Sequence, residues 1–173
     1  KMNDCINVLQ TRRSVKSYKS DPVPENMLKE VLKAGINAPT GMNRQSPVMV
    51  AVTDPETVRY IGNLNAKIMG ASTDAFYGAP VVIIVFSDTT VSTFKEDGCL
   101  VMGNLLNAAA SLGLGACWIH RAREVFETPE GKKLKEKWGL GSQYIGIGNC
   151  ILGYAAQIPE EKTHKANYVI YDK

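Results

Sequence analysis

The sequence predicts a layered fold of the α/β or α+β class, with a central β-sheet covered by helices. Residues 79–86 form an apolar run without alternation, which is typical of a strand that is buried on both faces. Residues 96–112 are rich in Ala and carry apolar side chains at helical spacing, which predicts a long buried helix. With 45% hydrophobic residues, the 173-residue chain can bury a sizeable core. We therefore expect a single domain over residues 1–173.

The N-terminal third predicts two helices. Residues 3–10 place Ile6 and Leu9 on one side of a short amphipathic pattern, so a helix leads into the basic residues that follow. Residues 21–24 contain two prolines and break the chain, and from Pro24 the apolar positions recur at helical spacing. Residues 35–41 are then expected to end this second helix and form a loop.

The middle and the C-terminal part predict strands around these helices. Residues 48–52 form a short apolar strand, and Asp54-Pro55 supplies an N-cap and a first-turn proline for the next helix. Residues 115–119 predict a further strand. Pro129 opens a Lys-rich helix that ends near Trp138 and Gly139. Apolar residues alternate over 145–151 in a Gly-rich strand, where the glycines indicate close approach of another backbone or a ligand.

The last segment, residues 157–173, predicts an extended arm. It contains Pro159 and a charged run, and then residues 168–171, which form a good strand pattern with nothing after it. Such a terminal strand needs a sheet edge elsewhere, and either this chain or a partner subunit can supply that edge.

Composition excludes several classes of function. A formal net charge of +3, from 20 Lys and Arg against 17 Asp and Glu, lacks the footprint of a nucleic-acid-binding protein. The four cysteines are scattered without a metal-binding or disulfide spacing, which favours reduced thiols in a cytoplasmic protein. No apolar stretch reaches the length that spans a bilayer. We expect a soluble cytoplasmic protein.

Two polar segments indicate a binding site. Residues 12–16 offer two guanidinium groups, a hydroxyl and an ammonium, which suit the oxygens of a phosphate ester. Residues 38–45 form a turn-rich loop, whose amide side chains and backbone groups can surround the edge of a flat heterocycle. Together the two segments predict a phosphorylated ring cofactor.

The order of five motifs resembles the short FMN-dependent nitroreductases. The motifs are Arg12-Arg13-Ser14-Val15-Lys16-x-Tyr18, Ala38-Pro39-Thr40-Gly41-x-Asn43-x-Gln45, Gly78-Ala79-Pro80, Leu112-Gly113-Leu114-Gly115-Ala116-Cys117-Trp118-Ile119 and Ile151-Leu152-Gly153-Tyr154. The resemblance implies a nitroreductase-like α+β fold in three α/β/α layers, with a central mixed β-sheet flanked by helices. It also implies a homodimer that holds FMN at the subunit interface and exchanges the 157–173 arms.

The resemblance also implies roles for individual residues. Positions that match phosphate contacts are Arg12, Arg13 and Ser14, while Lys16 matches a lysine at the pyrimidine edge of the flavin, where a cation stabilises the reduced form. The loop that lines the ring and ribityl chain comprises Pro39, Thr40, Gly41, Asn43 and Gln45. The segment at flavin N5 comprises Trp118, Ile119 and His120, with the backbone of His120 mattering more than its imidazole.

Two positions depart from the family pattern or are not fixed by it. Where relatives carry a phosphate-binding arginine near the C-terminus, this chain has His164, and either protonated His164 or Lys165 is expected to replace it. A helix residue at the pyrimidine edge is Asn63, Asn65 or Lys67, and spacing alone does not decide among them.

The leading functional hypothesis is an oxidoreductase that takes electrons from NADH or NADPH and reduces nitroaromatics, quinones or similar electrophiles by a ping-pong mechanism. The cofactor carries the chemistry in this family, so no catalytic acid, base or nucleophile of the protein is expected, and no metal. A second hypothesis is a non-catalytic protein that stores FMN or senses redox state. A third is a globular domain without a cofactor, whose basic run is solvated or contacts an acidic partner.

Overall fold

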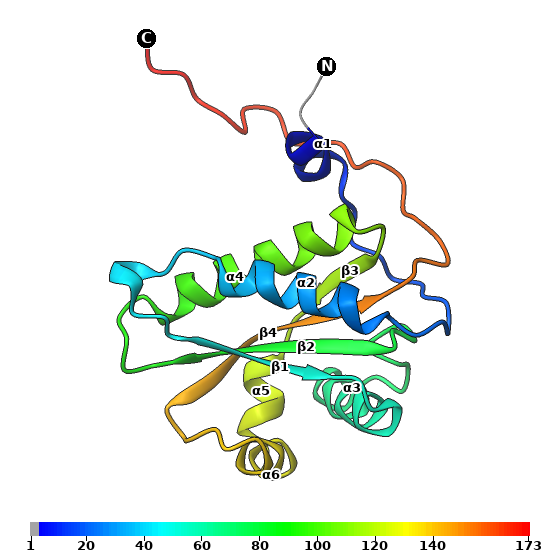
Figure 1. The fold of residues 1–173 in the computed structure, drawn as a ribbon, viewed down its shortest axis with the longest axis vertical. Helices are drawn as coiled ribbons and strands as arrows, with labels where there is room; N and C mark the ends of the chain where they lie inside the picture. Colours follow the sequence, from blue (N-terminus) through cyan, green and yellow to red (C-terminus); the bar gives the residue numbers. More distant parts are fainter. Residues whose placement is uncertain (1–3) are drawn as a thin grey trace.

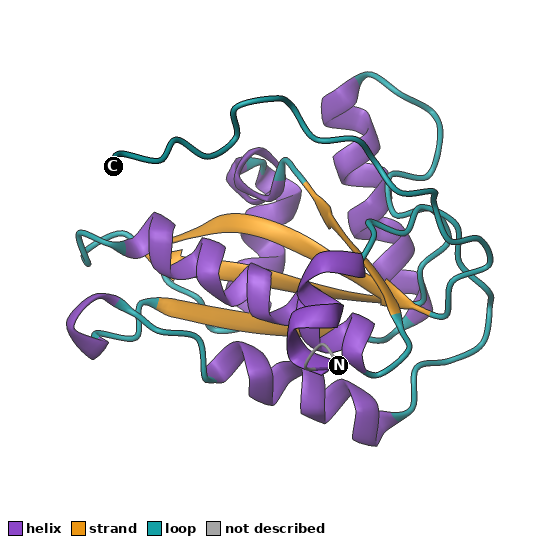
Figure 2. Ribbon diagram, turned by 90° about the horizontal axis from the view of Figure 1, so that it is seen from above, coloured by secondary structure: helices purple, strands orange, loops and turns teal. Residues whose placement is uncertain are grey.

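The computed structural model describes residues 4–173, which form one four-stranded sheet with helices on both faces (Figures 1 and 2). The strands are β1 (Pro47–Val52), β2 (Val81–Asp88), β3 (Gly115–Ile119) and β4 (Tyr144–Gly153), in the spatial order β1-β2-β4-β3. The helices are α1 (Asp4–Thr11), α2 (Glu25–Ile36), α3 (Pro55–Met69), α4 (Phe94–Ser111), α5 (Ala122–Glu127) and α6 (Pro129–Lys137), with a single 3₁₀ turn, η1 (Gly41–Asn43). Residue 3, where we expected the first helix to start, lies outside the described residues.

The sheet separates two helical layers, as the sequence predicted. Helices α2 and α4 cover one face, and α3, α5 and α6 cover the other (Figure 1). The side chains of β2 alternate between two hydrophobic clusters: Ile84 and Phe86 pack on the side of α5, and Ile83 and Val85 pack on the side of α4. All four are fully buried, so β2 is the central strand that its unbroken apolar run indicates.

The strand directions differ from the expected mixed sheet. All three neighbouring pairs, β1 with β2, β2 with β4 and β3 with β4, are antiparallel. Among the described residues, the parallel component is one isolated bridge between Ser14 and Ala116. A run of apolar residues shows that a strand is buried on both faces but does not show the direction of its neighbours, which is why the sequence could not settle this point.

Two helices begin at the residues that the sequence indicated. The Asp54 carboxylate accepts a hydrogen bond from the backbone N–H of Thr57 at 2.9 Å, and Pro55 is the first residue of α3. Thr128 caps α6 in the same way, by accepting from the N–H of Gly131 at 3.1 Å. The short helix α5 was not predicted, because its six residues are too few to show a helical period.

Two glycines of β4 allow close packing, which confirms the expectation for this strand. A Cβ atom at Gly146 would lie 2.5 Å from the backbone of Ala122, so only glycine lets α5 approach the sheet this closely. At Gly148 a Cβ atom would lie 2.7 Å from the indole of Trp118. These two residues therefore place the start of α5 and the Trp118 ring against the sheet.

The C-terminal arm leaves β4 and runs away from the sheet (Figure 1). An isolated bridge between Ala155 and Tyr18 precedes the arm, and the predicted strand at 168–171 does not form within the described chain. Its apolar side chains stay exposed; Ile170, for example, is 88% exposed. A strand needs a hydrogen-bonding neighbour, and the part of this chain that the structure describes offers none to residues 168–171. Within the described residues, no helix is both long and apolar enough to cross a membrane.

Candidate functional site

The basic segment and the arm together line a pocket of about 340 Å³. The side chains that line it are Leu9, Gln10, Arg12, Arg13, Ser14, Lys16, Pro159, Glu161, Lys162 and His164. Four cations face one carboxylate in this pocket, so its field favours an anion. Helix α1 brings the arginines to the pocket from one side, and the arm closes it from the other.

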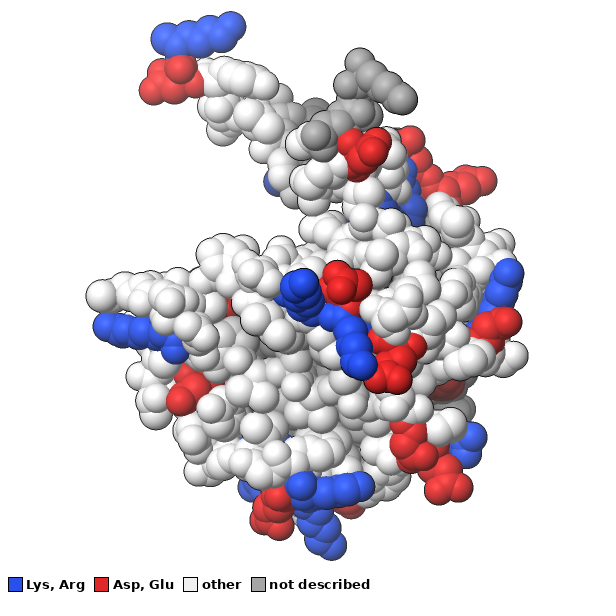
Figure 3. Space-filling view, in the orientation of Figure 1, with Lys and Arg blue, Asp and Glu red and all other residues white. Residues whose placement is uncertain are grey.

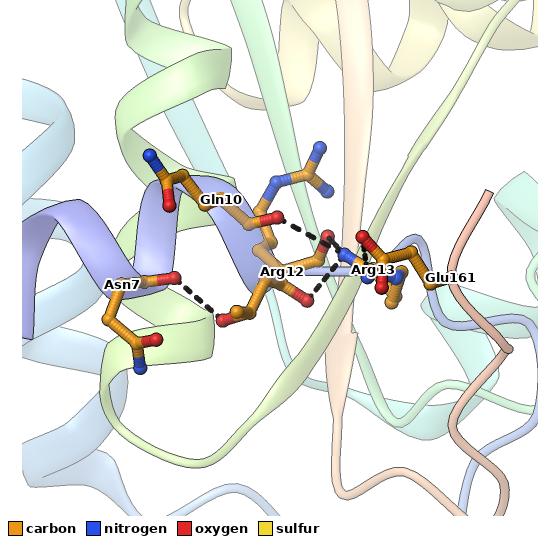
Figure 4. A network of polar contacts seen from close by, with 6 residues as sticks. Asn7, Gln10, Arg12, Arg13 and Glu161 are labelled. Carbon is orange, nitrogen blue, oxygen red and sulfur yellow. Dashed lines mark hydrogen bonds and ion pairs between the residues drawn. The ribbon is translucent and has the colours of Figure 1, made fainter. Parts of the chain in front are cut away.

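Arg13 is largely committed to the end of α1. Its Nη1 donates to the carbonyl oxygens of Thr11 at 2.7 Å and Arg12 at 3.0 Å, and it approaches Gln10 at 3.4 Å (Figure 4). These carbonyls are left without helical partners where α1 ends, and a cation there stabilises them. Its Nη2 also lies 3.7 Å from the Glu161 carboxylate, which is 79% exposed and contributes little energy. Arg13 thus anchors the helix end and the arm.

Arg12 is the residue that the fold leaves available. Its Nη1 is buried and has no hydrogen-bond partner among residues 4–173, although Arg12 lines the same pocket. A buried guanidinium nitrogen without an acceptor costs free energy, so its position is consistent with a group that binds there. A phosphate ester meets this requirement because its oxygens accept several charged hydrogen bonds at once.

One edge of β3 is open beyond Ala116, the residue that bridges to Ser14 of the basic segment. The N–H of Val15 donates to the Ala116 carbonyl at 3.0 Å, so residue 116 points its backbone groups outward. Cys117 and Ile119 pair with β4, and alternation therefore turns the N–H and C=O of Trp118 to the same free edge as residue 116. Lys16 follows two residues after the bridge. The residues that we expected to contact a phosphate, Lys16 and the outward backbone groups of Trp118 thus lie along one edge.

Loop 38–45 is held by a buried carboxylate. The Asp97 carboxylate of α4 accepts from the backbone N–H of Gly41 at 2.9 Å and from the hydroxyl of Ser46 at 2.7 Å. Burial raises the pKa of Asp97, but hydrogen bonds from Ser46, Gly41 and Thr93 outweigh burial and hold the pKa below its ordinary value.

The same loop stores backbone strain. Met42, Asn43 and Gln45 all have positive φ, between 51° and 53°. Such residues cost of the order of 1–3 kcal/mol each, and they cluster at functional sites. The Gln45 amide donates to the Asn43 side-chain oxygen at 3.2 Å, and both residues, with Thr40, line a second pocket. Pro39 is exposed beside them.

One protomer does not bring the basic pocket and this loop together. The loop leads into β1, an edge strand, whose Pro47 pairs with Ser87 at the end of β2. The basic segment lies alongside β3, which is the opposite edge strand of the sheet. Its contact there, Ala116, lies level with the start of β2. The two segments are thus separated by the width of the sheet and by roughly 20 Å along the strands. One ring system cannot touch both within a single chain.

The residues after β3 are fixed from the α3 side. Asn65 is fully buried, and its Nδ2 donates to the carbonyl of His120 at 2.8 Å, whereas Asn63 and Lys67 are exposed. Of the three candidates on this helix, Asn65 is the one with a hydrogen bond to the segment that follows β3. The Ile119 side chain packs in the core on the α5 side, and its carbonyl accepts from Asn149, so the structure does not turn this residue to the open edge of β3.

The structure also distinguishes His164 from Lys165, the two candidates near the C-terminus. His164 lines the basic pocket, while Lys165 lies with its ammonium 5.2 Å above the ring of Tyr168 and is not among the lining residues. Lys162, which the sequence analysis did not select, does line the pocket. No motif marks it, and only the course of the arm reveals it.

The pocket offers no activated nucleophile. Burial raises the pKa of the Cys117 thiol even though Lys16 and Arg12 lie near it, so the thiol stays protonated at neutral pH. Among the described residues, no group of His, Cys, Asp and Glu could hold a metal ion. The pocket offers charge and hydrogen-bond donors to a ligand.

Comparison with known proteins identifies the family. A model described as the nitroreductase family matches residues 9–73 and 65–154. The chain belongs to the nitroreductase family. A crystal structure of a nitroreductase with bound FMN from Bacteroides fragilis covers 99% of this chain and is itself covered completely, with a TM-score of 0.89 and 26% identity. The nitroreductase-like α+β fold is thus confirmed.

Two curated relatives of this nitroreductase-family chain carry related names. A putative NADH dehydrogenase/NAD(P)H nitroreductase of Methanothermobacter thermautotrophicus is 29% identical over 160 residues, which are 90% of this chain and 80% of the relative. An NADH dehydrogenase of Thermus thermophilus is 28% identical over 147 residues. The match covers 82% of this chain, which spans 63% of the length of that relative.

Proposed function

We propose that this protein is an FMN-dependent oxidoreductase that uses NADH or NADPH to reduce nitroaromatics, quinones or similar electrophiles by a ping-pong mechanism. The observation that carries the proposal is the buried, unpartnered Nη1 of Arg12 in a cationic pocket at the open edge of β3. The names of the relatives, which include NADH dehydrogenase and FMN reductase, favour an oxidoreductase over a protein that only stores FMN.

The residues of this chain fit FMN in two parts. Arg12, Ser14 and His164 would hold its phosphate, since they line the basic pocket. Lys16, the outward backbone groups of Trp118 and the backbone N–H of His120, whose carbonyl Asn65 engages, would hold the ring along β3. When bound, FMN supplies the electron transfer between the nicotinamide donor and the acceptor.

The protein side of the mechanism is binding, orientation and charge. Lys16 would place a positive charge near the pyrimidine edge of the ring and so favour its reduced form. The β3 edge would leave one ring face open, on which donor and acceptor bind in turn. The Trp118 ring is fixed over Gly148 and gives this edge a rigid base.

We also propose a homodimer in which the second subunit completes the site. The 38–45 loop lies at the opposite edge and end of the sheet from the basic pocket, so a copy of this chain is the simplest source of a loop for each pocket. The 157–173 arm, with exposed Tyr168, Val169 and Ile170, would cross to the partner. The unpaired edge of β1 is one place where its strand could add.

The proposal includes a single domain and a cytoplasmic location. Residues 1–173 would form a single domain with its arm at 157–173. A cytoplasmic location is supported by Cys99, Cys117 and Cys150, which are free thiols. Basic and acidic side chains are interspersed on the face shown in Figure 3, in line with a protein that does not bind nucleic acid.

An anaerobic titration tests the function. The purified protein is expected to be yellow, to release FMN identified by mass, and to lose its visible flavin absorbance when NADPH or NADH is added. Return of the absorbance when a nitroaromatic or a quinone is added would support the reductase. Flavin that stays oxidised with both donors would favour the non-catalytic FMN-binding protein. A colourless protein that does not take up FMN would contradict both FMN hypotheses.

A further inference from the structure

A separate cavity of about 350 Å³ lies beyond the C-terminal end of β3. It is formed by the end of β3, the start of α5, the first half of α4 and the first half of β4. Its lining residues include Lys95, Trp118, His120, Arg121, Arg123 and Glu124. Trp118 and His120 are the residues that we place beside the ring, so this cavity adjoins the proposed flavin site and does not belong to the phosphate pocket.

Arg121 is held rigidly at the mouth of this cavity. Its φ is 72°, a left-handed conformation that costs a residue with a side chain of the order of 1–3 kcal/mol. Its Nε donates to the Oδ1 of Asn65 at 3.0 Å, while Asn65 holds the neighbouring carbonyl of His120. This bond engages one of the five N–H donors of the guanidinium. A preorganised fork therefore remains for a ligand.

The same backbone is held a second time from β4. Asn149 is 1% exposed, and its Nδ2 donates to the Ile119 carbonyl at 3.1 Å and approaches the His120 carbonyl at 3.4 Å. Two buried amides from different elements thus converge on one turn. Such a turn keeps the position of Arg121 when a substrate enters.

The charge of the cavity is positive. Lys95, Arg121 and Arg123 line it together with the single carboxylate of Glu124. Arg123 also pairs with Glu127 at 3.0 Å, but this is an exposed pair within one helix and is weak. Arg121 is half-buried and is held by Asn65, whereas Lys95 and Arg123 are exposed.

We propose that this cavity receives an oxyanion carried by a substrate of the reductase, and that Arg121 is the residue that selects for it. The inference rests on the proposed function, because it places the cavity next to the flavin ring. The oxyanion is either the 2′-phosphate of NADPH or a carboxylate of the electron acceptor. Both are recognised by a planar guanidinium through two parallel hydrogen bonds.

The test compares substrates that differ only in this group. With the holoprotein, kcat/KM is measured for NADPH against NADH, and for 4-nitrobenzoate against 4-nitrobenzyl alcohol. The main variant is Arg121→Gly. Glycine adopts the left-handed conformation without strain, so the variant protein should fold. We expect a loss of about tenfold or more for the anionic member of one pair and little change for its neutral or less charged partner.

Two further variants sharpen the comparison. Arg121→Lys keeps the charge but loses the fork, and should recover only part of the preference. Lys133→Ala removes an exposed charge of α6 outside this cavity and should change neither pair. A loss confined to the nucleotide pair assigns the site to the donor, and a loss confined to the benzoate pair assigns it to the acceptor. Equal effects on both members of both pairs would overturn the proposal.

A binding measurement gives a readout that does not need turnover. Calorimetry of the purified protein compares adenosine 2′,5′-bisphosphate with adenosine 5′-monophosphate, and benzoate with benzamide. Tighter binding of one anion that Arg121→Gly abolishes would support the site even if the protein proved not to be a reductase. If Arg121→Gly instead lowered FMN content without changing any anion preference, Arg121 would be a flavin contact and the inference would be wrong.

Discussion

The Asp97 carboxylate accepts the backbone N–H of Gly41 at 2.9 Å and so joins α4 to loop 38–45 across 56 positions of sequence. Asp97 is 2% exposed, and its other oxygen accepts from the hydroxyls of Ser46 and Thr93. Three donors satisfy one buried charge, and none of them is basic. The strained loop thus has its position set by a carboxylate that reaches no ligand itself.

Replacing Asp97 with alanine should destabilise the protein and loosen the loop. The change leaves the Gly41 N–H and the Ser46 hydroxyl without their acceptor, at a cost of about 1–3 kcal/mol in the free energy of unfolding. Urea unfolding measures this cost. Asp88→Ala is a suitable control, because that carboxylate caps an exposed turn at Thr90. Equal midpoints for the two variants would show that the buried network does not stabilise the fold.

The same carboxylate predicts a dependence on pH. Because its pKa is lower in the folded protein than in the unfolded chain, Asp97 contributes stability that is fully present above the unfolded value. This stability is lost as pH falls below about 4, through the lower folded pKa. The stability difference between wild type and Asp97→Asn, measured by thermal unfolding from pH 7 to pH 3, should therefore shrink in the acid range. A constant difference would contradict an ionised Asp97.

Replacing Arg12 with alanine should loosen FMN by roughly 1.5 to 3 kcal/mol if its fork meets a phosphate. Fluorescence titration of the apoprotein with FMN measures the affinity. Arg12→Lys should lie between wild type and alanine, and Arg59→Ala, an exposed arginine of α3, should leave the affinity unchanged. Riboflavin, which lacks the phosphate, should bind the wild type and Arg12→Ala alike. Unchanged FMN affinity in Arg12→Ala would refute the phosphate role.

The two buried cysteines should resist alkylation in the folded protein. Burial raises the pKa of Cys150 to about 12, and the pKa of Cys117 is also raised. The thiolate is the reactive form, and neither side chain is accessible. Iodoacetamide at pH 8 followed by peptide mass spectrometry should therefore label Cys99, which is exposed, well before these two. Rapid labelling of Cys117 in the native protein would show that the β3 region opens.

The sequence predicted the parts of this fold that local pattern determines. The run before Asp88, the cap at Asp54 and the glycines of β4 each carry their own physical signal, and each appears in the structure where it was expected. Strand direction, in contrast, depends on how connections cross the sheet, and an apolar run contains no information about it. The helix α5 is too short for periodicity to show.

Some residues of the candidate site could likewise be predicted from local sequence, and others could not. Arg12 and Lys16 were predicted because the basic residues within 12–16 stand out in a chain of low net charge, and both line the basic pocket. The sequence did not indicate Arg121 as a candidate anion-binding residue. Its position depends on a positive φ and on a hydrogen bond to Asn65, which lies 56 positions earlier. Similarly, Arg13 and Arg12 look alike in sequence. Only the carbonyls at the end of α1 separate the residue that anchors the helix from the one left for a ligand.

Deleting the arm from Gln157 should yield monomers or insoluble protein. The arm exposes Ile158 and the apolar residues at 168–171, and its predicted strand lacks a neighbour within one chain, so its natural place in the proposed dimer is on the partner. This deletion also removes Lys162 and His164 from the basic pocket. A shorter deletion of residues 168–173 keeps both and isolates the strand. Sedimentation equilibrium measures the mass of each form, and FMN content reports on the pocket. A soluble dimer after deletion from Gln157 would show that the arm is local and that other surfaces hold the subunits together.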